Sequence, residues 1–132
     1  MSETLRLSDV AQDRALTAAE YELVEWLLEH GTSSTQDYKA QLESLWVVAK
    51  CSCGCASIDF SVDGKVPEAT SRMDVLSDFC WETDSGALQG CFLFARGNQL
   101  AGLELWSVDG IEVASELPDI KTLRPFGVRN DA

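Results

Sequence analysis

Three cysteines within five residues are the part of this sequence best suited to chemistry. Cys51, Cys53 and Cys55 alternate with a serine and a glycine. Thiolates are soft ligands, so this run could supply three of the ligands of a zinc or copper ion. The usual structural zinc sites instead use cysteine pairs separated by two to four residues. Cysteine also packs well in cores, so a structural role and a redox role stay open beside metal binding.

Two further cysteines, Cys80 and Cys91, fall on strands that we expect to be neighbours. A two-residue turn at Ser85-Gly86 would place Cys80 directly opposite Cys91. This cross-strand thiol pair could form a redox-sensing disulfide, or it could simply fill one face of the sheet. Either cysteine, or His30, could also provide a fourth ligand to the first cluster. The odd number of cysteines, five, argues against a framework of disulfides.

The sequence offers no catalytic constellation. Its single histidine, His30, must serve any Ser-His-Asp or Cys-His arrangement. We expect His30 at the end of a helix, where a cation interacts favourably with the last carbonyls. Glycine-rich phosphate loops and the HExxH and GxSxG motifs are absent from the sequence. We therefore predict no catalytic residues, and the sequence points away from an enzyme.

Carboxylates and one tryptophan make up the second candidate site. The same register places Asp78, Glu82, Glu104 and Trp106 on the face of the sheet opposite to the core. An aromatic side chain among carboxylates suits a basic protein partner. The alternatives are a solvated acidic face, a site for a hard cation or for acid–base chemistry, and burial of Trp106 by the C-terminal tail.

Charge and length limit the classes of protein to consider. The 132 residues are 45% apolar and fit a single domain, 1–132. The 22 acids and 10 bases give a net charge of −12, which argues against binding nucleic acid or an anionic membrane. The N-terminus resembles no secretory signal, and no apolar run approaches the ~18 residues of a membrane span. We therefore expect a cytoplasmic protein with no membrane contact.

The elements that must position these side chains fall into three stretches. Residues from about 8 to 44 are expected to be helical, those from about 45 to 115 to form the sheet, and 116–132 to form a tail. Thr17 and Glu20 have the spacing of a capping box, which predicts a helix from about Ala18 to His30. Tyr38, Leu42 and Leu45 then form the apolar stripe of a second helix. The fold expected is α+β, with two N-terminal helices packed on one face of an antiparallel meander of about five strands.

Two-residue turns at Ser85-Gly86 and Gly97-Asn98 would fix which side chains share the core face. A slip of one residue would reverse every assignment, so this face is a test of the register. The expected core face consists of Val75, Phe79, Trp81, Phe92, Phe94, Leu103 and Leu105.

The order of short motifs adds a resemblance. A capped helix at 16–23 is followed by a Cys53-Gly54-Cys55 hairpin, the strand Leu103-Glu104-Leu105-Trp106-Ser107 and a late Leu117-Pro118. In this order the chain resembles a family of small uncharacterised bacterial proteins of about this length. The resemblance implies a compact bacterial cytoplasmic domain and supplies no activity and no site residues.

Two functions from different classes follow from these features. The first is a non-enzymatic acidic interaction domain, immunity-like or regulatory, whose partner is a basic protein and which needs no cofactor. The alternative is a thiol or metal protein that holds zinc or copper through Cys51, Cys53 and Cys55. The sequence fixes neither the oligomeric state nor the order of the strands.

Overall fold

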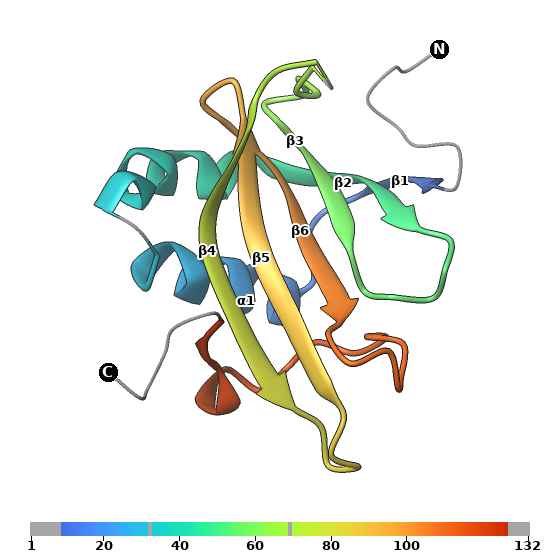
Figure 1. Cartoon of the computed structure of the whole chain (residues 1–132). Coiled ribbons are helices and arrows are strands. Elements are labelled where there is room, and N and C mark those ends of the chain that lie inside the picture. The colour runs from blue at the N-terminus through green and yellow to red at the C-terminus, as the bar shows by residue number, and fades with distance from the viewer. Residues whose placement is uncertain (1–8, 32, 69, 127–132) are drawn as a thin grey trace.

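The structure, a computed structural model, describes residues 9–31, 33–68 and 70–126. Figure 1 shows an antiparallel sheet in front of helix α1, which confirms the expected α+β class. Within the described residues the sheet has seven strands rather than about five. The elements in chain order are β1 (Asp9–Arg14), α1 (Ala18–Glu29), the 3₁₀ helix η1 (Ser33–Ser44), β2 (Leu45–Cys51), β3 (Ile58–Val62), β4 (Met73–Glu82), β5 (Leu88–Arg96), β6 (Gln99–Ser107), the 3₁₀ helix η2 (Ile120–Thr122) and β7 (Arg124–Pro125).

Helix α1 begins at the predicted capping box. The Thr17 hydroxyl accepts from the Glu20 backbone N–H at 3.1 Å, and the Glu20 carboxylate accepts from the Thr17 N–H at 2.9 Å. Arg14 pairs with the same carboxylate at 2.9 Å. Two backbone donors that the first helical turn leaves unpaired thus find partners. The helix ends at its C-cap, His30, whose Nδ1 lies 2.9 Å from the Trp26 carbonyl oxygen.

Removing the cap hydroxyl is expected to weaken the whole fold. Thr17→Ala should lower the free energy of unfolding by about 1 kcal/mol, because the Glu20 N–H loses its acceptor. Thr17→Ser keeps the hydroxyl and is the matched control. Urea denaturation followed by tryptophan fluorescence measures both variants. An unchanged midpoint for Thr17→Ala would show that the cap does not stabilise the protein.

The second helical stretch differs in type from the expectation. Tyr38, Leu42 and Leu45 are buried, as their spacing predicts. The helix that carries the first two is η1, a 3₁₀ helix of 12 residues. Runs of this type rarely exceed one turn. The serine- and threonine-rich start of this segment has low α-helical propensity, which fits the change of type.

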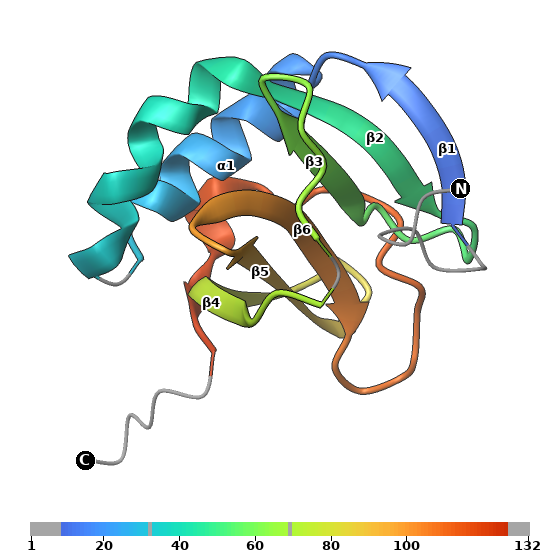
Figure 2. The ribbon, with the colours of Figure 1, turned by 90° about the horizontal axis from the view of Figure 1, so that it is seen from above.

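The sheet is built from two local halves. Its strand order is β1-β2-β3-β6-β5-β4-β7. The first half comprises β1, β2 and β3, and the second half comprises the other four strands. The halves join where β3 pairs with β6, through the pairs Ile58↔Leu103 and Asp59↔Gly102. Figure 2 shows the sheet curving, with the helices gathered on one side of it.

Both outer strands of the sheet lie in stretches for which we expected other structure. β1 falls within the stretch predicted to be helical, about 8–44, and pairs with β2. β7 falls in the tail 116–132 and pairs with β4 through Phe79 and Cys80. Between β6 and β7 the only regular element is the short η2, so the sheet does not continue to residue 115.

The register of β4 and β5 corrects the predicted faces. The turn between them spans five residues, since Glu82 pairs with Leu88. The Thr83 N–H donates to the Ala87 carbonyl at 2.8 Å, and Gly86 adopts φ +89°. The two-residue turn predicted at Ser85-Gly86 is therefore wrong. The longer turn shifts β5 by one residue, which turns each of its side chains to the opposite face.

The register of β5 and β6 changes along its length. The Gly97-Asn98 turn is as predicted, because Arg96 pairs with Gln99. A shift between Phe94 and Ala95 then places Leu93, not Phe92, opposite Leu103. Such a bulge adds one residue to one strand and cannot be read from turn residues alone.

The core therefore differs from the predicted core face. Of the predicted set, Phe79, Trp81, Leu103 and Leu105 belong to the core, whereas Val75 is exposed. Phe92 and Phe94 lie on the outer face instead, where Phe94 is nevertheless buried. The largest fully buried side chains of the described residues are Phe60, Leu23, Leu27, Leu28, Leu93, Leu100, Leu103, Leu105, Val24, Val47 and Cys91.

Candidate metal centre

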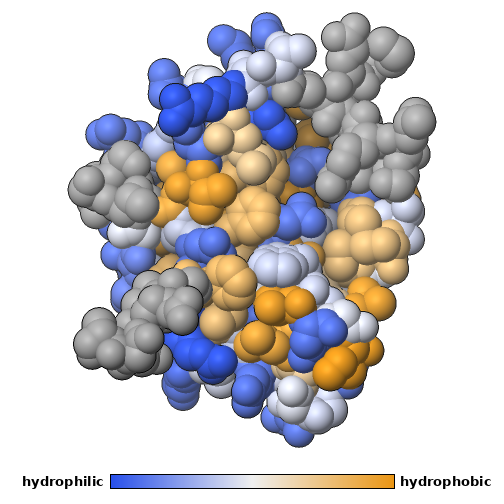
Figure 3. Space-filling view, viewed as in Figure 1, coloured by the Kyte–Doolittle hydropathy of each residue, from blue (hydrophilic) through white to orange (hydrophobic). Residues whose placement is uncertain are grey.

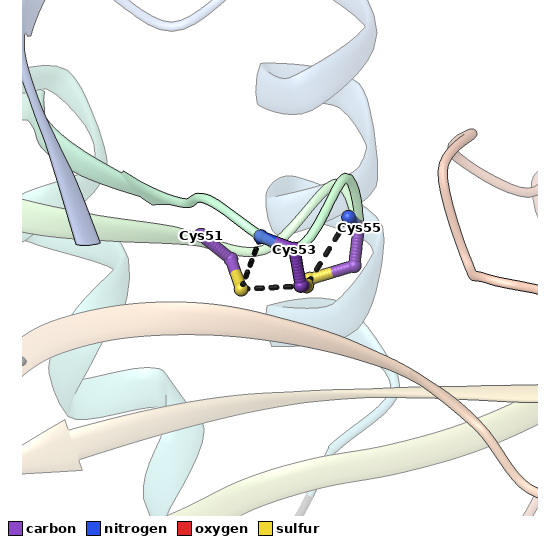
Figure 4. Close-up of side chains that lie close together, drawn as sticks. All are labelled: Cys51, Cys53 and Cys55. Atoms are coloured by element: carbon purple, nitrogen blue, oxygen red, sulfur yellow. Dashed lines mark hydrogen bonds between the residues drawn. The ribbon is translucent and has the colours of Figure 1, made fainter. Parts of the chain in front are cut away.

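The three clustered cysteines lie where β2 turns into β3. Cys51 is the last residue of β2, and Cys53 and Cys55 lie in the turn that follows. Gly54, between them, has φ +99°, a conformation that favours glycine. The turn thus brings three alternating side chains to one side. Figure 4 shows their sulfur atoms pointing toward one another.

The Cys53 sulfur lies between the other two. It is 2.6 Å from the Cys51 sulfur and 3.0 Å from the Cys55 sulfur. All three sulfur atoms lie within 4.8 Å of one another. The cysteines are free thiols, with Cys53 exposed and the other two half-buried. A cluster of thiols this close is able to share one soft cation.

Backbone N–H groups point at two of these sulfur atoms. The Cys53 N–H donates to the Cys51 sulfur at 3.3 Å, and the Cys55 N–H donates to the Cys53 sulfur at 3.4 Å. Hydrogen bonds to the charged form of a group favour that form. The turn therefore supplies donors for thiolates, which are the forms that bind metals.

The turn is anchored to the far half of the sheet. The buried Ser57 hydroxyl donates to the Leu105 carbonyl at 3.0 Å and accepts from the Leu105 N–H at 2.8 Å. The Ala56 N–H donates to the Ala114 carbonyl at 2.8 Å. These bonds hold the turn against β6 and the loop that follows it. No local pattern marks Ser57 as a functional residue, because its partner Leu105 is distant in the chain.

Cys51 and Cys53 do not release their protons equally. Hydrogen bonds from the thiols of Cys51 and Cys55 and from the Cys55 N–H lower the pKa of Cys53. The hydrogen bond to Cys53 and burial raise the pKa of Cys51 to about 12. Cys53 therefore loses its proton before Cys51 does, and the groups around Cys53 stabilise its thiolate.

This order of proton loss predicts an order of alkylation. Because only the thiolate reacts, iodoacetamide near pH 7 should modify the metal-free reduced protein first at Cys53 and later at Cys51. Cys91 should stay unmodified until the protein unfolds, since it is fully buried. Peptide mass mapping at short reaction times measures which cysteine is alkylated first. Equal labelling of Cys51 and Cys53 would contradict it.

The number of donors fits a three-thiolate site. Among residues 9–31, 33–68 and 70–126, no imidazole or carboxylate joins the three sulfur atoms. Zn–S bonds are about 2.3 Å long, so sulfur atoms around one zinc ion lie roughly 3.8 Å apart. The Cys53 sulfur lies closer than this to both of its neighbours, so binding an ion would move it away from them. Cys53 is exposed, which leaves its side chain room to move.

The other two cysteines do not form the predicted pair. Cys80 lies opposite Gly90, and Cys91 lies opposite Phe79 in the core. The five-residue turn causes this correction, because it turns Cys91 to the inner face. Burial raises the pKa of Cys91 to about 12 and also raises that of Cys80. Both are protonated side chains that pack, and neither joins the three-cysteine cluster.

The residues expected to bind a partner lie on the outer face of the sheet. Asp78, Phe92 and Glu104 form one row across β4, β5 and β6. Trp106 lies in the next row, and its indole ring covers Gly90, where a Cβ would come within 2.8 Å of Nε1. Glu82, at the end of β4, is exposed. The aromatic part of this face differs from the expectation, which placed Phe92 in the core.

The C-terminal tail reaches this face, as one alternative anticipated. Phe126 packs edge-on against Trp106, with ring centroids 5.4 Å apart. Its N–H donates to the Asp78 carbonyl at 3.0 Å. Asp78 Oδ1 and Trp106 Nε1 are buried, and neither has a hydrogen-bond partner among the described residues. The tail thus covers part of the face without satisfying these two polar atoms.

Comparison of the chain with known protein families, curated proteins and solved structures returned no match. The resemblance to small bacterial proteins therefore stays an expectation. Within the described ranges of the chain, none of the helices has the length and apolar character needed to cross a membrane.

Proposed function

We propose that this protein binds one soft metal ion, Zn(II) or Cu(I), through the thiolates of Cys51, Cys53 and Cys55. The convergence of three sulfur atoms within 4.8 Å carries the proposal. Thiolates select Cu(I) and zinc over hard cations. We place the protein in the bacterial cytoplasm, where thiols stay reduced and available to a metal.

Native mass spectrometry of the reduced protein tests this proposal directly. The wild-type protein should take up one ion when titrated with Zn(II), and with Cu(I) under anaerobic conditions. Cys53→Ser should lose this uptake, because Cys53 lies between the other two sulfur atoms. Cys80→Ser is the matched control, since it removes a thiol outside the cluster. No uptake by the wild-type protein, or equal uptake by Cys53→Ser, would refute the proposal.

A second candidate function is the docking of a basic protein segment on the outer face. The buried, unpaired Asp78 Oδ1 needs a donor and Trp106 Nε1 needs an acceptor. A lysine or arginine side chain supplies the donor, and a peptide carbonyl supplies the acceptor. Figure 3 shows hydrophobic surface in the middle of this face with hydrophilic residues around it. The net charge of −12 would attract such a partner.

Binding of a synthetic lysine-rich peptide measures this second function. Affinity should fall as salt is added, because charge attraction is screened. The double substitution Asp78→Asn with Trp106→Phe should weaken binding further, whereas Ile111→Ala, on the loop after β6, should not. If the affinity for the peptide changes with neither the salt concentration nor the double substitution, this face is excluded as the docking site.

A further inference from the structure

The two closest thiols of the cluster form a reactive pair. The sulfur atoms of Cys51 and Cys53 lie 2.6 Å apart. A disulfide bond is about 2.05 Å long, so a small movement joins them. Cys53 is exposed, so a small molecule in solution reaches its sulfur.

Of the two sulfur atoms, that of Cys53 is the better placed to attack. It belongs to the exposed side chain, and the Cys55 N–H points at it from 3.4 Å. Cys51 is half-buried and lies within reach once Cys53 has reacted. This is the arrangement of an attacking thiol beside a resolving thiol.

Cys55 is less suited to resolve the reaction. Its sulfur lies 3.0 Å from that of Cys53, farther than the Cys51 sulfur. Its thiol also donates to the Ser57 hydroxyl at 3.4 Å, and Ser57 is fixed by two bonds to Leu105. Cys55 is therefore held on the side of the cluster that faces β6.

We propose that Cys51 and Cys53 reduce low-molecular-mass disulfides by thiol–disulfide exchange, and that the bond formed between them abolishes metal binding. The Cys53 thiolate attacks one sulfur of the small disulfide, forms a mixed disulfide and releases one thiolate. Cys51 then loses its proton and attacks the Cys53 sulfur. The Cys51–Cys53 bond forms as the second small thiolate leaves. Two electrons pass from the protein pair to the small disulfide, and both released thiolates take up protons.

The second half of this inference rests on the proposed metal site. A Cys51–Cys53 disulfide removes two of the three thiolates, and one thiolate cannot hold the ion. The converse also follows, because an ion bound to Cys53 occupies the lone pair that attacks the disulfide. Metal loading and oxidation thus exclude each other.

Treatment of the reduced, metal-free protein with oxidised glutathione tests the exchange. The wild-type protein should lose two hydrogen atoms, and peptide mapping should place the new bond between Cys51 and Cys53. Cys80→Ser keeps the pair, removes a thiol outside the cluster and should behave as the wild type does. With both Cys51 and Cys55 replaced by serine, the reaction should stop at one glutathione on Cys53. Cys53→Ser should react at least about tenfold more slowly, because it lacks the exposed attacking sulfur.

Each outcome decides one part of the inference. A wild-type chain left unaltered by oxidised glutathione, or a bond mapped to another pair, overturns the exchange. Zinc titration before and after oxidation then separates the two proposals. Exchange without zinc uptake by the reduced protein leaves this activity standing and refutes the metal site. Equal zinc uptake by the reduced and the oxidised protein overturns the mutual exclusion.

Discussion

Replacing Phe60 with alanine is expected to lower the free energy of unfolding by about 3–5 kcal/mol. Phe60 is fully buried in β3, opposite Val47, on the strand that joins the two halves of the sheet. Its loss removes buried apolar surface and leaves a cavity that close-packed neighbours fill only in part. Domains of this kind are stable by roughly 5–15 kcal/mol in total. Phe60→Ala should therefore populate the unfolded state under mild denaturing conditions.

Urea denaturation followed by tryptophan fluorescence measures the Phe60 effect. Val113→Ala is a suitable control, because Val113 is 56% exposed and its change should stay within about 0.5 kcal/mol. A loss below about 1 kcal/mol for Phe60→Ala would mean that this side chain is not central to the core.

Metal binding should produce the second large effect. At a free metal concentration about 100 times the Kd, a ligand that binds only the folded protein adds about 2.7 kcal/mol to the free energy of unfolding. Thermal denaturation of the reduced protein with and without Zn(II) reads this change. Cys53→Ser should abolish the stabilisation, whereas Cys80→Ser should retain it. A chelator should return the wild-type melting temperature to its metal-free value.

The pH dependence of this stabilisation follows from the thiols. Binding an ion requires that the cysteines lose their protons, so metal binding releases protons and weakens as pH falls. Cys51 holds its proton more strongly than Cys53, since the pKa of Cys51 is raised to about 12 and that of Cys53 is lowered. Metal must therefore compete with that proton across the neutral range. A stabilisation equal at pH 6 and pH 8 would contradict thiolate ligation.

Local patterns in the sequence predicted the local parts of the fold. The capping box at Thr17 and Glu20 is complete within four residues, so its effect does not depend on distant contacts. The prediction of a two-residue turn at Gly97-Asn98 is likewise confirmed, and Asn98 has φ 66°. Spacing also brought the three cysteines together, because alternate residues in a turn converge on one side. The cap and the Gly97-Asn98 turn are decided by neighbouring residues alone, whereas the cysteine turn also depends on its bonds to β6.

Features that depend on distant contacts escaped prediction. The order of strands in the sheet could not be read from the sequence, and the pairing of β3 with β6 was not foreseen. A single turn of unexpected length reversed the faces of β5 and separated Cys80 from Cys91. β1 carries no apolar alternation, so nothing local marked it as a strand. The bonds from Ser57 to Leu105 that fix the candidate site depend on the β3–β6 contact.

The join between the two halves of the sheet also shapes how the chain folds. Short connections link β2 to β3, β4 to β5 and β5 to β6, so these hairpins form by closing small loops. Pairing Ile58 with Leu103 instead closes a long loop. The chain loses conformational entropy in closing this loop before packing contributes favourable free energy. Contacts between residues distant in sequence slow folding, so the pairing of β3 with β6 is among the slow steps, as are those of β1 with β2 and of β4 with β7. The cysteine turn, held through Ser57 and Leu105, takes its final shape only when β3 has met β6.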